Sequence, residues 1–112
     1  MRLTSEIVVA ALVRRVFADG GFAAIERRGS DAAGAIFVVA RGRSGALQLF
    51  GPAPQTLAGE GGERRFLREA ASDEDALRQR LEREARFDPD FWVVEIETDT
   101  PEAYLTLADE GE

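Results

Sequence analysis

The sequence predicts one α+β domain, built from a mainly antiparallel sheet of four or five strands and two helices. The chain has 112 residues, which is enough for one hydrophobic core and too few for two. Two segments, near the N-terminus and after residue 72, place apolar residues at helical spacing. Short runs rich in Val, Ile and Phe, bounded by Gly or Pro, predict the strands. The expected order is α-β-β-β-(β)-α-β, with a domain at residues 1–98 and an acidic tail at 99–112 that is partly ordered at most.

The first helix is expected to begin with Thr4 or Ser5 as its N-cap, to run to about Asp19, and to end at Gly20-Gly21. Apolar residues occupy more than one of its sides. A helix that is apolar nearly all round is normally buried, so we expect this helix to be mostly buried against the sheet. Its clearly polar side chains are Glu6, Arg14, Arg15 and Asp19.

Three strands are expected next, at residues 22–28, 35–41 and 46–50, with a hairpin at residues 42–45 joining the last two. Residues 36–39, Ile-Phe-Val-Val, leave no polar face. The second strand should therefore be central and covered on both sides.

Residues 51–63 hold four Gly and two Pro, which predicts a long loop and a candidate recognition loop or lid. A polar edge strand is expected at residues 64–70.

Ser72, with Asp75 three residues later, predicts the start of a second helix. Its narrow apolar stripe places this helix on the surface of the domain. Pro89 should end this helix, and a strand is expected at residues 91–98. In the tail that follows, Tyr104, Leu105 and Leu107 are candidates for packing against the domain.

The composition excludes several kinds of catalysis. The chain contains no Cys, no His and no Lys, and all 14 of its basic residues are Arg. It therefore cannot form a Ser-His-Asp triad, a thiolate nucleophile, a Cys/His zinc site, a lysine Schiff base or a phosphate-loop lysine. Any metal would be a hard ion such as magnesium or calcium, held by oxygen ligands. These exclusions favour a protein that is not an enzyme and has no cofactor.

Charge is divided unevenly along the chain. Residues 1–72 carry 10 Arg and 7 acids, or +3, and residues 73–112 carry 4 Arg and 14 acids, or −10, which gives the net charge of −7. A net acidic protein repels nucleic acid phosphates at long range. The apolar run Ile7–Val13 is too short to span a membrane and ends in two Arg, so the cytoplasm is the expected location.

Five carboxylates gather around Pro89, and four of them are candidate binding residues: Asp88, Asp90, Glu95 and Glu97. Part of this pattern resembles a nuclease motif in which a Pro-Asp pair precedes an acid and a lysine, but this chain has Glu97 where that lysine would stand. If Asp90 and Glu95 share a strand, they point to opposite faces, about 16 Å apart. They cannot then share a metal ion, and we predict no catalytic residue and no metal site here.

The same segment has a structural explanation. The residue before a proline avoids helical backbone angles, so Asp88 should end the helix, and Pro89 fixes the turn. Asp88 and Asp90 can both accept backbone hydrogen bonds there. Trp92 should anchor the following strand in the core. The remaining carboxylates, Glu95 and Glu97, fall on one face, where they meet either solvent, Arg partners or a divalent ion.

Arg14 and Arg15 are the last two candidate binding residues. Both can lie on the solvent side of the first helix, where a guanidinium suits bidentate contacts with phosphate or carboxylate. Arg27 and Arg28 are adjacent in a strand and should point to opposite faces, so they cannot join one patch. Because no exposed aromatic residues are interleaved with the Arg residues, nucleic acid binding is not the favoured interpretation.

Several segments of the chain form a distinctive combination: Arg2-Leu3-Thr4-Ser5-Glu6-Ile7, Ala11-Leu12-Val13-Arg14-Arg15, Gly21-Phe22-Ala23-Ala24, Arg27-Arg28-Gly29, Ala33-Gly34-Ala35-Ile36, Gly51-Pro52-Ala53-Pro54-Gln55 and residues 86–97. Together they resemble a small alphaproteobacterial domain-of-unknown-function family, the one numbered 1491. The resemblance covers almost the whole chain and implies a bacterial, cytoplasmic, single-domain protein. It implies no activity and supplies no catalytic residues. One departure is Val8, where the family pattern has an aromatic residue.

Three hypotheses about function follow from the sequence. The favoured one is a small protein-interaction or adaptor module, with a protein partner or a second copy of the chain bound at a sheet edge, the glycine-rich loop or the acidic tail. The second is an enzyme or binder that uses carboxylates and Arg on a small phosphorylated ligand with a divalent metal. The third is a weak nucleic-acid binder that uses Arg residues.

Overall fold

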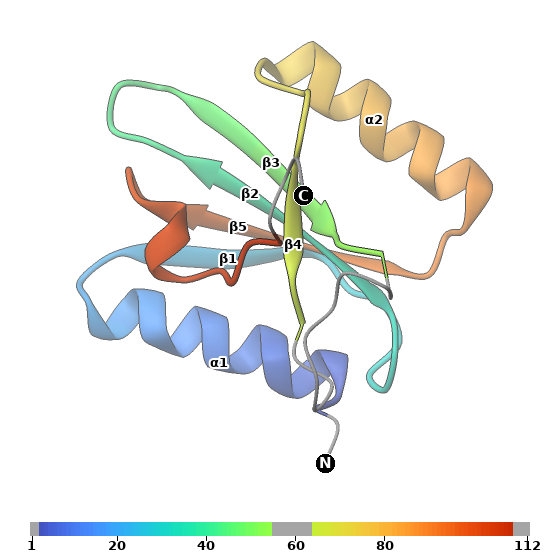
Figure 1. Ribbon diagram of the computed structural model, residues 1–112, viewed down its shortest axis with the longest axis horizontal. Coiled ribbons are helices and arrows are strands. Elements are labelled where there is room, and N and C mark those ends of the chain that lie inside the picture. Colours follow the sequence, from blue (N-terminus) through green and yellow to red (C-terminus); the bar gives the residue numbers. More distant parts are fainter. Residues whose placement is uncertain (1–2, 55–63, 109–112) are drawn as a thin grey trace.

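A computed structural model of the chain describes residues 3–54 and 64–108 (Figure 1). The expected elements are present in the expected order, and the ambiguous fourth strand exists. Residues 55–63, most of the candidate recognition loop, lie outside the described part. The elements are α1 (Ser5–Ala18), β1 (Phe22–Arg27), β2 (Ala35–Arg41), β3 (Leu47–Pro52), β4 (Phe66–Glu69), α2 (Glu74–Phe87), β5 (Phe91–Glu97) and the short 3-10 helix η3 (Pro101–Ala103).

The five strands form one mixed sheet in the order β1-β5-β2-β3-β4. Three of its pairings are antiparallel, and β2 and β5 are parallel. The prediction that residues 35–41 form a central strand is confirmed, since β2 lies between β5 and β3 and its middle five residues are all buried. A parallel neighbour needs a long crossover connection, and here it runs through β3, β4 and α2.

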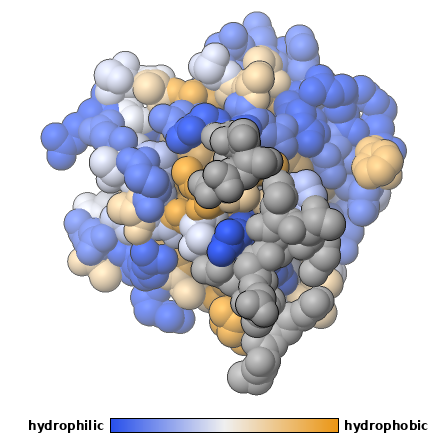
Figure 2. Space-filling model, in the orientation of Figure 1, coloured by the Kyte–Doolittle hydropathy of each residue, from blue (hydrophilic) through white to orange (hydrophobic). Residues whose placement is uncertain are grey.

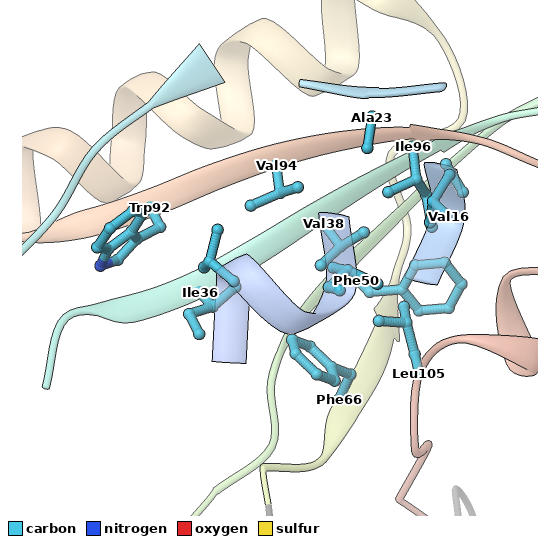
Figure 3. Close-up of a cluster of buried hydrophobic side chains, with 13 residues drawn as sticks. Val16, Ala23, Ile36, Val38, Phe50, Phe66, Trp92, Val94, Ile96 and Leu105 are labelled. Carbon is cyan, nitrogen blue, oxygen red and sulfur yellow. The ribbon is translucent and has the colours of Figure 1, made fainter. Parts of the chain in front are cut away.

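The two helices cover opposite faces of the sheet (Figure 1). Residues alternate between faces along each strand, so Trp92, Val94 and Ile96 face α1 while Phe91 and Val93 face α2. The α1 side holds the larger cluster, in which side chains from β2, β3, β4 and β5 meet Val16 and Leu105 (Figure 3). The smaller α2 cluster packs Leu77 against the central strands.

Two details of the helices differ from the prediction. Helix α1 is not mostly buried: only Ser5, Val9, Leu12 and Val16 are, because the sheet touches one side of the helix. Helix α2 is capped by Asp73, whose side chain accepts a hydrogen bond from the backbone nitrogen of Ala76, and not by Ser72.

The segment after β5 packs onto the domain as far as residue 108. Pro101 and Leu105 are buried, and Tyr104 and Leu107 pack against the larger cluster. Leu107 forms a parallel bridge with Phe66 of β4. This segment therefore covers the outer edge of β4. Within residues 3–54 and 64–108, no helix is long and apolar enough to cross a membrane.

Candidate functional site

A polar cleft of about 880 Å³ lies at the carboxyl ends of the parallel strands β2 and β5. In sheets with parallel strands, this end commonly carries the ligand site, because the loops that leave neighbouring strands diverge there. The walls come from the turn after α1, the β2–β3 hairpin, the start of α2 and the segment after β5. The charged and hydroxyl-bearing residues of its lining are Asp19, Arg41, Arg43, Glu74, Glu97, Thr98, Asp99, Thr100 and Tyr104.

Arg41 is the central cation of this cleft, and its charge is already paired. Its Nε lies 3.0 Å from a carboxylate oxygen of Glu95, and a terminal nitrogen donates to Glu74 at 3.2 Å. The other terminal nitrogen also contacts Glu74. The hydrogen bonds that Arg41 donates to Glu74 and then to Glu95 raise the pKa of Arg41, and the contact with Arg41 lowers the pKa of Glu74.

The lowered pKa of Glu74 predicts how stability depends on pH. A carboxyl whose pKa falls on folding stabilises the protein above its ordinary pKa, and this contribution is lost as pH falls through the folded-state value. We therefore expect Glu74→Gln to flatten the decline in melting temperature below pH 4.5, the ordinary value. Thermal melts from pH 6 to about pH 3 would measure it. The matched control is Asp75→Asn, since Asp75 lies one residue further along the same helix and bonds Arg78 instead. If the melting temperature of Glu74→Gln falls with decreasing pH as steeply as that of the wild type, the prediction is contradicted.

The other groups in the cleft also bond to their neighbours. Asp99 accepts a hydrogen bond from the backbone nitrogen of Arg43 at 2.8 Å and so holds the hairpin. The Tyr104 hydroxyl donates to Asp19 at 2.7 Å, which raises the pKa of Tyr104. In the described part of the chain, no three carboxylates converge as ligands for one metal ion. The charge of Arg41 is already balanced by Glu74 and Glu95, and four carboxylates line the cleft. The cleft is therefore a poor site for a phosphate, which carries negative charge.

The structure separates the six sequence-predicted binding residues. Glu95 and Glu97 lie at the cleft end of β5, and Glu95 meets Arg41, one of the alternatives left open by the sequence. Asp88 and Asp90 lie at the opposite end of that strand. Sequence reasoning missed Arg41 and its partner Glu74, because strand β2 and helix α2 are far apart along the chain.

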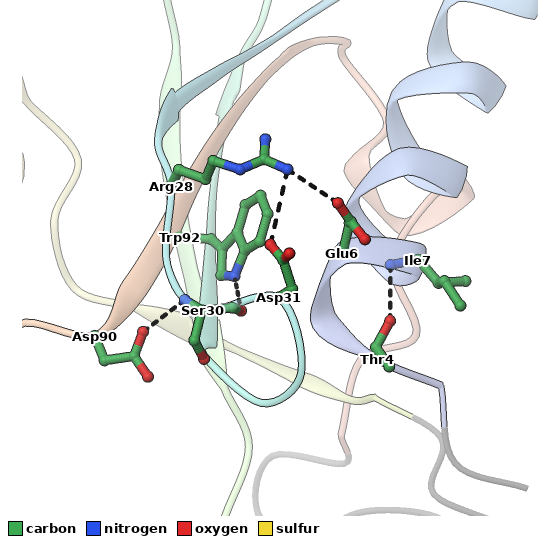
Figure 4. Close-up of polar contacts among 8 residues, drawn as sticks. All are labelled: Thr4, Glu6, Ile7, Arg28, Ser30, Asp31, Asp90 and Trp92. Atoms are coloured by element: carbon green, nitrogen blue, oxygen red, sulfur yellow. Dashed lines mark hydrogen bonds and ion pairs between the residues drawn. The ribbon is translucent and has the colours of Figure 1, made fainter.

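Asp88 and Asp90 hold the turn that leads into β5. Asp88 ends α2 and accepts from the Asp90 backbone nitrogen at 3.1 Å. Asp90 accepts from the Ser30 nitrogen at 2.7 Å, and the Trp92 indole nitrogen donates to the Ser30 carbonyl at 2.9 Å (Figure 4). These contacts lock the turn after β1 onto the start of β5. These hydrogen bonds therefore support a structural role for the segment around Pro89.

Ser5 fixes the start of α1 to the same turn. Its side chain is fully buried, and its hydroxyl donates to the Gly34 carbonyl at 2.6 Å and accepts from Arg64 at 3.1 Å. Removing a buried hydroxyl leaves its partners unsatisfied, so Ser5→Ala should lower the free energy of unfolding by about 1–2 kcal/mol. Urea denaturation would measure this change, with the exposed Ser44→Ala as control. A change as small as that of the control would contradict the prediction.

Arg14 and Arg15 have different environments. Arg15 donates to the carbonyls of Ala103 and Tyr104 at 2.8 and 3.2 Å, so it attaches the C-terminal segment to α1. Arg14 is exposed and makes no hydrogen bond or ion pair within residues 3–54 and 64–108. The two guanidiniums therefore do not form one anion-binding patch.

Arg14 lies in a largely apolar stripe on the outer side of α1, and Glu6, which pairs with Arg28, flanks this stripe. Ile7, Ala10, Arg14 and Phe17 recur at helical spacing, so they lie along one side of the helix. Ile7 and Phe17 are each 51% exposed. The stripe continues onto β1, because Phe17 packs edge-to-face against Phe22 with ring centres 5.9 Å apart. We call the outer side of α1, together with the exposed apolar residues that precede it and those of β1, the α1–β1 surface: Leu3, Ile7, Ala10, Arg14, Phe17, Phe22, which also lines the polar cleft, and Ile25.

The surface over α2 is different in character. Figure 2 shows the part of the molecule over α2 as mostly hydrophilic. Phe87, the last residue of α2, is 88% exposed. Of the six exposed large apolar residues in the described part of the chain, the other five belong to the α1–β1 surface. Exposed apolar residues that cluster in this way mark interaction sites more often than single ones do.

Strand β1 also has an unpaired edge. Its only partner among the described residues is β5, whereas the other edge strand, β4, is covered by the C-terminal segment. The pairing of β1 shifts register between Ile25 and Arg27, and this bulge turns Arg27 towards Phe91 on the α2 face. Arg28 then stacks on Trp92 on the α1 face, so Arg27 and Arg28 do point to opposite sides.

A groove of about 300 Å³ runs beside this edge, between β1 and α2. Its floor is apolar and its rim is charged. The floor is formed by Leu81, Ala85, Phe91 and Val93, and the rim by Glu26, Arg27, Arg78 and Glu82.

Comparison with known proteins identifies close relatives. A family model described as a protein of unknown function, DUF1491, matches residues 3–106. The solution structure of protein Atu0922 from A. tumefaciens is 53% identical, with a TM-score of 0.86, and the alignment covers 100% of this chain and 99% of that one. No curated protein matches the chain.

Two structures of DUF1491 family proteins from Caulobacter crescentus CB15 are also similar. The NMR structure is 40% identical with a TM-score of 0.78 and covers 99% of each chain. The crystal structure is 39% identical with a TM-score of 0.78, covering 99% of this chain and 100% of that one. None of these relatives brings a known activity. The chain belongs to the DUF1491 family of proteins of unknown function.

Proposed function

We propose that the chain is a cytoplasmic, non-enzymatic interaction module that binds a partner protein through the α1–β1 surface. One observation carries this proposal: helix α1 is apolar on its outer side as well as on its core side, and the outer side is exposed. A helix with two apolar sides is normally covered on both. A bound partner would cover the second side of α1 together with β1.

The residues of the α1–β1 surface indicate which side chains the partner should present. Protein interfaces concentrate aromatic and Arg residues at a desolvated centre, and Phe17, Phe22 and Arg14 supply both kinds. Since Arg14 pairs with no residue in the described part of the chain, the partner should present an apolar patch with one carboxylate opposite Arg14. Binding should then be driven by apolar burial and should persist when salt screens charges.

Affinity capture from a nuclease-treated native lysate, at about 0.3 M salt, would test the proposal. The tagged wild-type chain should retain one stoichiometric protein, and Phe17→Asp should lose it. Phe87→Asp is the matched control, because it places the same charge at an exposed aromatic position outside the surface. The proposal fails if no protein is retained, or if both variants retain it equally.

A second candidate function is the binding of a small ligand in the polar cleft, supported by its volume and its place at the carboxyl ends of β2 and β5. The surplus of carboxylates favours a cationic or polyhydroxylated ligand over the phosphorylated one expected from the sequence. A thermal-shift panel of such compounds, repeated with Glu97→Gln, would test it. No stabilisation across the panel would rule this candidate out.

Nucleic acid binding has little support. Arg15 bonds to carbonyls, Arg27 donates to the Pro89 carbonyl at 2.8 Å, and Arg28 pairs with Glu6 at 3.1 Å. Such Arg residues hold the domain together, which leaves few of them to neutralise phosphates.

A further inference from the structure

We infer that the partner contributes a short extended segment that pairs with the outer edge of β1 and places a lysine or arginine in the groove beside it. This inference rests on the proposed function and names the chemistry of the partner. It combines three observations on residues 3–54 and 64–108: a strand edge that none of them covers, an apolar groove along that edge, and carboxylates on the groove rim that pair with none of them.

The edge available for pairing is short. Residues 22–25 of β1 pair regularly with β5, and the bulge interrupts the strand at Glu26. Bulges of this kind shorten an edge and limit indiscriminate pairing. An added strand gains backbone hydrogen bonds along such an edge, and its alternate side chains point to the two faces of the sheet.

The two carboxylates on the groove rim favour a positively charged side chain in the groove. Arg27 is engaged by the Pro89 carbonyl and the Phe91 ring, and Arg78 pairs with Asp75 at 3.0 Å. Glu26 and Glu82 form no ion pair within the described residues. A lysine or arginine can lay its methylene groups on the apolar floor while its charged end meets these carboxylates. The net charge of −7 also attracts a basic segment at long range.

The other face of the added strand would meet the apolar residues of the α1–β1 surface, Phe17 and Ile25. Side chains that point to this face should therefore be apolar. The segment is expected to alternate apolar and basic residues.

Two synthetic peptides of eight residues, one alternating Val and Lys and the other alternating Val and Glu, provide the test. Each is titrated into the isotopically labelled full chain, and backbone amide shifts are followed by NMR. The Lys peptide should shift the amides of residues 22–27 and bind at least about tenfold more tightly than the Glu peptide. The double variant Glu26→Gln/Glu82→Gln should reduce this preference to less than about threefold. The control Asp31→Asn/Glu102→Gln removes two exposed carboxylates elsewhere and should preserve it.

Equal binding of the two peptides, the absence of binding, or shifts confined to other elements would overturn the inference. Self-association of the chain that shifts the same β1 amides without peptide would assign the edge to a second copy and would also overturn it. If the peptides fail but a Phe17-dependent partner is captured, the inference is wrong and the proposed function stands. If no such partner is captured, the proposed function itself is wrong.

Discussion

Replacing Trp92 with alanine should lower the free energy of unfolding by about 3–5 kcal/mol, the usual cost of removing a large buried aromatic side chain. Trp92 is fully buried in the α1-side cluster, and its indole nitrogen donates to the Ser30 carbonyl. The backbone packs closely against its ring, since a side chain at Gly29 would approach Trp92 to 2.8 Å. The surrounding chain therefore has little freedom to fill the cavity.

Urea denaturation followed by far-ultraviolet circular dichroism would measure the change, because Trp92 is the only tryptophan and its fluorescence is lost in the variant. Trp92→Phe should fall between wild type and Trp92→Ala, since it keeps much of the packing and loses the hydrogen bond. Phe87→Ala is the matched control and should change stability by less than about 0.5 kcal/mol. Comparable stability of Trp92→Ala and Phe87→Ala would show that Trp92 is not the anchor of β5.

Replacing Phe17 with serine should weaken partner binding by at least about 30-fold, or about 2 kcal/mol, which is typical of an aromatic residue at the centre of an interface. The cost to folding should be smaller, at about 1 kcal/mol, because half of the side chain is exposed and its edge-to-face contact is with Phe22, which is itself exposed. Binding and stability should therefore separate in this variant.

Calorimetric titration of the captured partner would measure the affinity, and thermal melts of the free chain would measure the stability. Phe87→Ser should match wild type in both. A Phe17→Ser chain that binds normally, or one that loses binding only because it unfolds, would contradict the assignment of the α1–β1 surface.

Much of the fold could be predicted from the sequence because its signals are local. The apolar run at residues 36–39 predicts a central strand, and β2 is one. Pro89 and its flanking aspartates predict a helix stop and a turn, and α2 ends at Phe87, with both carboxylates bonded to backbone nitrogens. Alternation along residues 91–97 assigns Trp92 and Phe91 to opposite faces.

The candidate sites could not be predicted in the same way because they depend on contacts between distant segments. Arg41 pairs with Glu74 across 33 residues, and nothing local in the sequence links them. Helix α1 shows a second limit of prediction from the sequence. Its apolar outer side is evident in the sequence and predicts burial within the domain, but the structure leaves that side exposed. Sequence cannot distinguish a side covered by the chain's own sheet from one that a partner would cover.

Photo-crosslinking in living cells tests the central claim most directly. Benzoylphenylalanine placed at Ile7 or Phe17 should yield one discrete cross-linked product, because both positions lie on the α1–β1 surface. The same probe at Arg83, which is exposed on α2, should yield none. We predict a single partner protein at the first two positions. No product at these positions, or the same products at all three, would contradict an interaction module built on α1 and β1.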